Sequence, residues 1–236
     1  MPIFNIYKPA GLTPLEVLEK LRTSKAELIR EKMTYAGRLD PLAEGVMLVV
    51  TGEDIARKEQ FLNLPKTYEV DILLGVGTDT GDVLGLVNEF KLGKIDLTEV
   101  KKASAGLVSR RWQTAPRYSA PGIDGKEFTK EVEVFTVQVA DQTEISAPDL
   151  LLDIEKRVGE VIGDFRQAKI TTGWQKWLAD NNQMFPVVKI TISASSGTYM
   201  RVLAEELGKV LNVPALAYKI KRTKVGEYSI TDSIVL

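Results

Sequence analysis

One aspartate stands in a stretch whose composition is suited to chemistry. Asp40 lies between two glycines in the stretch 37–45, and Pro41 follows it directly. Because proline disfavours the helical region for the residue before it, Asp40 is expected in an extended or turn conformation. The short apolar run 46–50 comes next and ends in a Thr-Gly pair, which predicts a buried strand that anchors the turn. A carboxylate on a rigid loop is suited to catalysis, although an ordinary tight turn has the same composition.

The composition limits the chemistry that is open to this chain. Its 236 residues include no cysteine and no histidine. This excludes catalytic thiols, disulfides, zinc fingers and imidazole acid–base catalysis, so carboxylates, Lys, Arg, Tyr and hydroxyls remain. The formal net charge of −1 argues against a uniformly basic nucleic-acid binder, although one face can be basic while the rest compensates. The chain shows no leader pattern and no long apolar run, so we expect a soluble, cytoplasmic protein without a membrane segment.

The elements expected to position these groups are strands interleaved with helices. Helix starts are indicated at Thr13, at Asp96 and at Ser146 by capping residues and first-turn prolines. Period-two alternation predicts strands at 66–74, 132–139 and 187–194, and the segment 113–130 is expected to be a loop. The glycine-rich stretch 75–82 lacks the lysine and spacing of a Walker motif, so it indicates a turn.

The order of these elements predicts an α+β fold. Without regular βαβ alternation, the central sheet is expected to be mixed or mostly antiparallel, with flanking helices. We expect one catalytic domain over residues 1–236, with a helical insertion at about 141–184 between two strands that would otherwise be hairpin neighbours. After Arg222 only 14 residues follow, so no further C-terminal domain is expected.

Three separated motifs carry a resemblance to a known family. They are the stretch 37–46, the pair 66–68 with 74–82, and the stretch 196–201. In type, order and spacing, they resemble the catalytic motifs of the TruB family of tRNA pseudouridine synthases. The stretches 8–11 and 220–222 also resemble family motifs, so the likeness spans most of the chain apart from the expected insertion.

The resemblance implies a pseudouridine synthase fold and a reaction without cofactor or metal. Uracil is detached from its ribose, turned and rejoined through carbon 5, most specifically at U55 in the T-loop of tRNA. Asp40 is implied as the catalytic carboxylate, and whether it adds to the base or sugar or removes a sugar proton stays open. A dry pocket favours the neutral acid, so a cation must hold the charge, and Arg201 matches that role. Tyr68 matches the tyrosine that stacks on the extruded base, and Ile220 matches the apolar wall of the uracil pocket.

Further candidates for contact with the substrate come from the same motifs. One departure from the family pattern concerns the histidine five residues before the aspartate, because Tyr35 occupies that position. We expect Arg38 to be inserted in place of the extruded base, with Tyr35 as its support. The alternative is that Arg38 merely pairs with Glu44 on the same turn. The remaining candidate substrate-binding residues are Lys8, Tyr199, Lys221 and Arg222.

Two other functions stay open. The chain could be an enzyme of the same fold that acts on ribosomal RNA. It could also be an RNA-binding or RNA-folding protein without catalysis, which suits the basic residues of the segment 219–224. Retention of Asp40, Tyr68 and Arg201 together disfavours this second alternative, because a pure binder does not need that set. We therefore expect a monomeric isomerase whose partner is tRNA.

Overall fold

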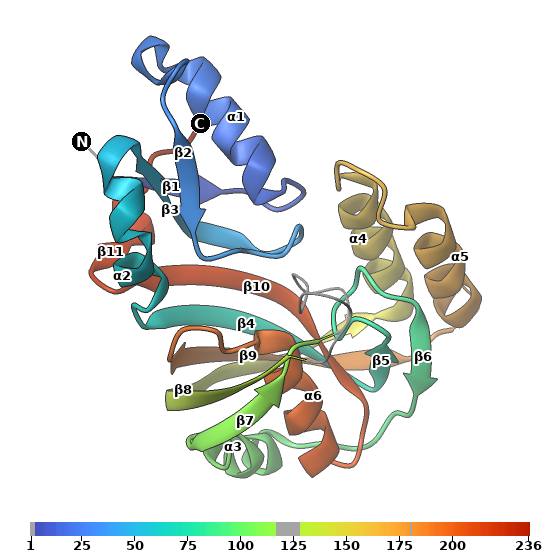
Figure 1. Cartoon of the computed structure of the whole chain (residues 1–236). Helices are drawn as coiled ribbons and strands as arrows, with labels where there is room; N and C mark the ends of the chain where they lie inside the picture. The colour runs from blue at the N-terminus through green and yellow to red at the C-terminus, as the bar shows by residue number, and fades with distance from the viewer. Residues whose placement is uncertain (1–2, 117–127, 180) are drawn as a thin grey trace.

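The fold is built around one large, mixed sheet. The computed structural model describes residues 3–116, 128–179 and 181–236. Its larger sheet consists of β1 (Ile3–Lys8), β2 (Met33–Ala36), β3 (Glu44–Thr51), β4 (Lys66–Leu74), β7 (Arg110–Thr114), β8 (Thr129–Ser146), β9 (Met184–Ala194), β10 (Ala215–Val225) and β11 (Tyr228–Ser229). The strand order is β1-β3-β10-β4-β9-β8-β7, with β2 paired to β3 and β11 to β10 (Figure 1). A separate hairpin is formed by β5 (Val76–Thr78) and β6 (Val87–Phe90).

The helices flank this sheet. They are α1 (Pro14–Ser24), α2 (Lys58–Leu62), α3 (Leu97–Ala105), α4 (Ala147–Gly159), α5 (Gln167–Leu178) and α6 (Met200–Val210). On β4, Val70, Ile72 and Leu74 pack in one cluster with apolar residues of α3 and α6. Leu73 points to the opposite face, where its cluster includes α4 and α5. The prediction of an α+β fold with a mostly antiparallel central sheet is therefore confirmed.

The three indicated helix starts are confirmed by their caps. Thr13 and Glu16 form a reciprocal capping box at α1, and Asp96 forms the same arrangement at α3. The Ser146 side chain accepts a hydrogen bond from the Asp149 N–H at α4. Each cap satisfies backbone donors that an N-terminal helical turn leaves without partners.

Two expectations about the segments around β8 were wrong. Of the loop expected at 113–130, residues 113–114 belong to strand β7 and residues 129–130 to strand β8, while residues 117–127 lie outside the described residues. Residues 141–146 continue β8 beside β9 and are not helical. Because β7 pairs only with residues 129–133, the rest of β8 has a partner on one side and buries few side chains. Hydrophobic alternation, the signal that reveals a strand, is therefore weak there.

The segment between β8 and β9 forms a helical pair. β8 and β9 are antiparallel neighbours, and α4 and α5 connect them. Trp174 of α5 is fully buried, and its indole N–H donates to the Val83 carbonyl at 3.2 Å. Trp177 stacks on Phe90 of β6 with ring centroids 5.5 Å apart. Helix α5 thereby attaches to the β5–β6 hairpin, and Figure 1 shows α4 and α5 side by side.

A short parallel contact joins the N-terminal strands to the rest of the sheet. β3 pairs with β10 only through Lys221 beside Glu44 and Arg222 beside Gly45. Gly45 has a φ of 110°, and a Cβ atom at this position would lie 2.1 Å from the Arg222 carbonyl oxygen. Only glycine can therefore occupy this position without separating the strands. The contact lies directly after the Asp40 loop, which we define as residues 37–43.

Candidate active site

A cleft with a volume of about 220 Å³ brings together most of the predicted site residues. It lies between the Asp40 loop, β4, β10 and the first turn of α6. Its lining includes seven of the candidates, namely Arg38, Asp40, Tyr68, Tyr199, Arg201, Ile220 and Arg222. Three other candidates, Lys8, Tyr35 and Lys221, are not among the lining residues.

Arg201 and Asp40 form a two-point ion pair in this cleft. Arg201 Nε lies 2.9 Å from Asp40 Oδ2, and Nη2 donates to Oδ1 at 3.3 Å. The Arg201 side chain is 4% exposed, whereas that of Asp40 is 36% exposed. The arginine is therefore fixed inside the protein, while the carboxylate has one open side. Such a fork geometry holds a carboxylate in one orientation.

The position of Arg201 follows from the start of α6. Tyr199 is the N-cap residue, and its backbone N–H donates to the side-chain Oε1 of Gln113 at 2.9 Å. Met200, Arg201 and Leu203 belong to the buried face of the helix. The Arg201 guanidinium is further held by the Thr80 carbonyl, which accepts from Nη1 at 2.8 Å. A buried helix face thus carries the cation to the carboxylate.

A second carboxylate, which the sequence interpretation did not single out, also lies beside Arg201. Asp82 Oδ2 is 3.7 Å from Arg201 Nε, and the Asp82 side chain is 13% exposed. Asp82 Oδ1 accepts from Thr80 Oγ1 at 2.7 Å and from the Leu84 N–H at 3.0 Å. Burial raises the pKa of Asp82, while the Arg201 charge acts in the opposite direction. The glycine-rich stretch 75–82 therefore supplies an acidic neighbour to the arginine, and its place in the second motif was the available signal.

Two buried cations hold the Asp40 loop from behind. Lys8 is fully buried, and its Nζ donates to the carbonyls of Pro9 and Pro41, at 2.9 and 3.0 Å, and to that of Ala43. Burial lowers the pKa of Lys8 to about 7, against the opposing effect of Asp40. Arg222 donates through Nε to the Val46 carbonyl at 2.7 Å and through Nη1 to the Arg38 carbonyl at 3.1 Å. These contacts fix the backbone on both sides of Asp40.

Apolar side chains form the walls of the cleft. Tyr68 on β4 and Ile220 on β10 are each 9% exposed and line the cleft together with Leu39 and Met200. Tyr68 stands opposite Arg222 in the register of β4 and β10. These walls and the Arg201–Asp40 pair line one slot. A slot of this kind suits a planar, weakly polar ring.

The two residues of the predicted wedge lie in different places. Arg38 is exposed at the edge of the cleft. Within the described part of the chain Arg38 forms no ion pair. Glu44, the partner considered for it, accepts a hydrogen bond from the Tyr7 hydroxyl at 2.6 Å and lies 3.9 Å from Lys221 Nζ. The alternative of an Arg38–Glu44 pair is thus not seen. Tyr35 packs against the N-terminal core cluster, with Lys58 Nζ 5.8 Å from its ring centroid.

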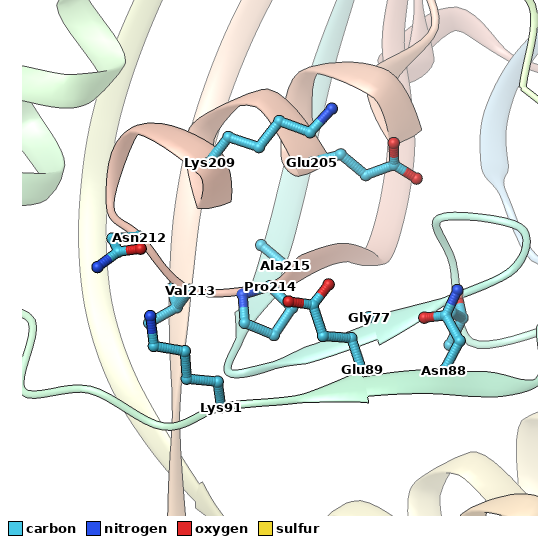
Figure 2. Close-up of a pocket in the computed structure, with 11 residues that line it drawn as sticks. Gly77, Asn88, Glu89, Lys91, Glu205, Lys209, Asn212, Val213, Pro214 and Ala215 are labelled. Carbon is cyan, nitrogen blue, oxygen red and sulfur yellow. The ribbon is translucent and has the colours of Figure 1, made fainter.

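Other cavities lie outside this cleft. One of about 350 Å³ lies against Asp40 and Arg201 and is closed by Phe165 and Arg166 from the connection between α4 and α5. Arg166 pairs there with Asp79 at 2.9 Å. Figure 2 shows another pocket, of about 420 Å³, lined by residues of β5, β6, α6 and the start of β10. None of the predicted site residues lines that pocket.

Neither a metal centre nor a membrane span is found in the described ranges. No group of three or more Asp and Glu side chains among those residues is arranged to hold a metal ion. None of the helices described there has the length and hydrophobicity to cross a membrane.

Solved structures share this fold over the whole chain. A crystal structure of a Cbf5-Nop10-Gar1 complex matches with a TM-score of 0.64 and 19% sequence identity, over 99% of this chain and 52% of that chain. The structure of an H/ACA RNP bound to a substrate RNA containing 2'-deoxyuridine matches with a TM-score of 0.62 and 17% identity, over 99% of this chain and 50% of that chain. The present chain thus spans about half the length of these solved chains. At such low identity the likeness shows the fold alone.

Sequence comparison identifies the family. The family model described as "TruB family pseudouridylate synthase (N terminal domain)" matches residues 25–159. A protein named tRNA pseudouridine synthase B from Endomicrobium trichonymphae is 28% identical over 96% of this chain and 86% of its own length. A protein of the same name from Deinococcus radiodurans is 29% identical over 100% of this chain and 77% of its own length. The chain belongs to the TruB family of pseudouridine synthases, which confirms the resemblance and makes it an isomerase.

Proposed function

We propose that this pseudouridine synthase acts on tRNA. Its target is a uridine of the T-loop, which we propose to be U55. The relatives that match over nearly the whole chain are named for tRNA. The observation that carries the chemical part of the proposal is the ion pair of Asp40 and Arg201 in a slot walled by Tyr68 and Ile220. We also propose that the enzyme acts in the cytoplasm as a single catalytic domain, in which α4 and α5 form the insertion.

The geometry supports a division of labour in which Asp40 is the reacting group. Its carboxylate is the most exposed member of the pair, so it can reach a base or a ribose in the slot. Arg201 orients the carboxylate and offsets the cost of placing its negative charge in a partly buried cleft. Asp40 thereby serves either as nucleophile or as base for a sugar proton, and both roles are compatible with a carboxylate that is 36% exposed.

The target base must leave the RNA stack to reach this carboxylate. Extrusion of a base costs a few kcal/mol, which stacking and hydrogen bonds in the pocket offset. Tyr68 offers an aromatic surface beside Ile220, so the extruded uracil is held between apolar walls while it detaches and turns. Arg38 lies at the edge of the cleft, where a guanidinium can stack in the space that the base leaves.

Lys8 differs in placement from the substrate-binding role predicted for it. It is buried and donates to backbone carbonyls around Asp40. We propose that Lys8 positions the loop and does not contact RNA, whereas Lys221, with a side chain 40% exposed, remains able to meet a phosphate.

The test is substitution of the carboxylate with retention of its shape. Asp40→Asn should bind a T-arm RNA with the affinity of the wild-type enzyme and release no tritium from carbon 5 of the target uridine. Turnover near that of the wild type would remove Asp40 from the chemistry. Mapping of pseudouridines in tRNA and rRNA from cells without the gene separates the substrates. Loss in rRNA alone would identify a ribosomal RNA enzyme, and no loss in either would favour an RNA-folding protein.

A further inference from the structure

Arg222 carries a buried donor that the protein itself does not satisfy. The residue is 2% exposed and lines the cleft. Its Nε and Nη1 donate to the Val46 and Arg38 carbonyls, whereas Nη2 has no hydrogen-bond partner among the described residues. A buried charged donor without an acceptor is unfavourable. An orphaned guanidinium nitrogen at a cleft wall therefore indicates an acceptor that arrives with the ligand.

Two lysines add positive charge to this part of the cleft. Lys66, at the start of β4, is 4% exposed and also lines the cleft, where its Nζ donates to the Leu62 and Leu64 carbonyls. An ammonium has three donors, so one remains. Lys130 of β8 donates from Nζ to the Ser196 carbonyl at 3.0 Å and lies against Gly197. Burial lowers the pKa of Lys66 to about 8, and the charges of Arg222 and Lys130 add to this effect. The three cations therefore share one electrostatic environment.

The balance of charge in the cleft shows what kind of acceptor fits. Four basic residues but only one carboxylate line the cleft among the residues that the structure describes. That carboxylate, Asp40, is paired with Arg201. Arg222 and Lys66 therefore have no acidic partner there, and Lys130 adds a third positive charge beside them. An anion with several acceptor oxygens fits such a cluster better than a neutral carbonyl, because charge-assisted hydrogen bonds are the stronger ones.

We propose that Arg222, Lys66 and Lys130 form an anion subsite that binds a backbone phosphodiester next to the target uridine. This inference rests on the proposed function, since an RNA substrate supplies the phosphodiester. Arg222 and Tyr68 are opposite each other on neighbouring strands, so the phosphate and the extruded base are held side by side. The subsite fixes the ribose of the target nucleotide from its phosphate, while Asp40 meets the other end of the same nucleotide.

The test neutralises the phosphate rather than Arg222, because Arg222 also supports the Asp40 loop. T-arm RNAs carry a single, uncharged methylphosphonate at either linkage that flanks the target uridine. With the wild-type enzyme, one of the two replacements should raise KM by about 10- to 100-fold, the range expected for loss of charge-assisted hydrogen bonds. With Lys130→Gln the same replacement should cost clearly less, because the partner of the phosphate is already weakened.

Lys176→Gln is the matched control, because Lys176 is an exposed lysine on α5, away from the cleft. In this variant the methylphosphonate should cost as much as in the wild type. If neither replacement affects the wild-type enzyme, or if the penalty is equal in Lys130→Gln and wild type, the subsite is refuted. Failure of the proposed function would look different, because the wild-type enzyme would then form no pseudouridine even in the unmodified RNA.

Discussion

Two buried arginines, Arg201 and Arg222, line the cleft, but their surroundings are opposite. Arg201 meets the carboxylates of Asp40 and Asp82 and a backbone carbonyl. Among the residues that the structure describes, Arg222 meets backbone carbonyls only, and its Nη2 has no acceptor. A compensated arginine serves the protein, because it orients a reacting carboxylate. An arginine with a nitrogen that lacks an acceptor is available to a ligand. Burial alone therefore does not distinguish an arginine that orients a protein carboxylate from one that binds a ligand.

The largest loss of activity is expected when Arg201, the arginine with carboxylate partners, is replaced. Arg201→Met leaves Asp40 and Asp82 close together without their cation. Removal of one partner from a buried ion pair costs about 3–5 kcal/mol, so we expect kcat to fall by about 150- to 5000-fold. Single-turnover assays measure this loss, and binding of RNA to the variant should be weakened far less than turnover. A modest loss of kcat would mean that another cation supports Asp40.

A smaller effect is expected when the support behind the loop is removed. Lys8→Met removes a buried donor from the Pro41 and Ala43 carbonyls, of which Pro41 keeps a second donor, the Gly11 N–H at 3.0 Å. We expect the free energy of unfolding to drop by about 2–4 kcal/mol and kcat to fall by about 10- to 100-fold, because Asp40 loses its fixed position. Denaturant unfolding and kcat of the same preparation check both parts. Unchanged kcat in a destabilised variant would restrict Lys8 to stability.

Arg38 tests whether the edge of the cleft assists extrusion of the base. On an intact T-loop, Arg38→Ala should reduce kcat/KM by at least about tenfold, since unstacking costs a few kcal/mol. On an RNA whose target uridine is already unstacked, the loss should be small. Equal losses on both RNAs would make Arg38 a structural residue and leave the wedge unassigned.

The smallest effect concerns the pH dependence of RNA affinity, which Lys66 is expected to control. The pKa of Lys66 is lowered to about 8 by burial, with Arg222 and Lys130 as further causes. Lys66 is charged below this pKa and loses its charge as the pH rises through it, so RNA affinity should decline between about pH 7 and 9. We expect a decrease of up to about tenfold in a titration by fluorescence anisotropy. Lys66→Arg should remove this dependence, and a decline that persists in the variant would assign it to another group.

Much of the site could be predicted because the sequence motifs contain the side chains that line the cleft. Asp40, Tyr68, Arg201 and Ile220 were identified from the sequence, and they line one cleft. The loop supports could not be predicted in the same way. Lys8 and Arg222 donate to backbone carbonyls, and backbone acceptors leave no pattern in a sequence. A buried cation therefore resembles a surface cation until the strands are placed.

The fold could be predicted where the sequence pattern is strong, and the prediction was wrong where the pattern is weak. Capped helices and strands with two buried neighbours show clear periodicity, whereas residues 141–146 of β8 and the four-residue strand β2 do not. Asp82 was missed because a turn rich in glycine and threonine gave no indication that its carboxylate is buried beside an arginine. Partners far apart in sequence decide such positions.

The short parallel contact between β3 and β10 also has a consequence for the order of folding. The Asp40 loop belongs to the N-terminal strands, while Arg222 and Arg201 come from the last quarter of the chain. Each part can form its own local hairpins early, since loop closure favours short separations. Catalytic geometry exists only after the distant parts dock at Gly45. In a refolding chain, turnover should therefore return later than secondary structure. A partly assembled enzyme is expected to form no pseudouridine.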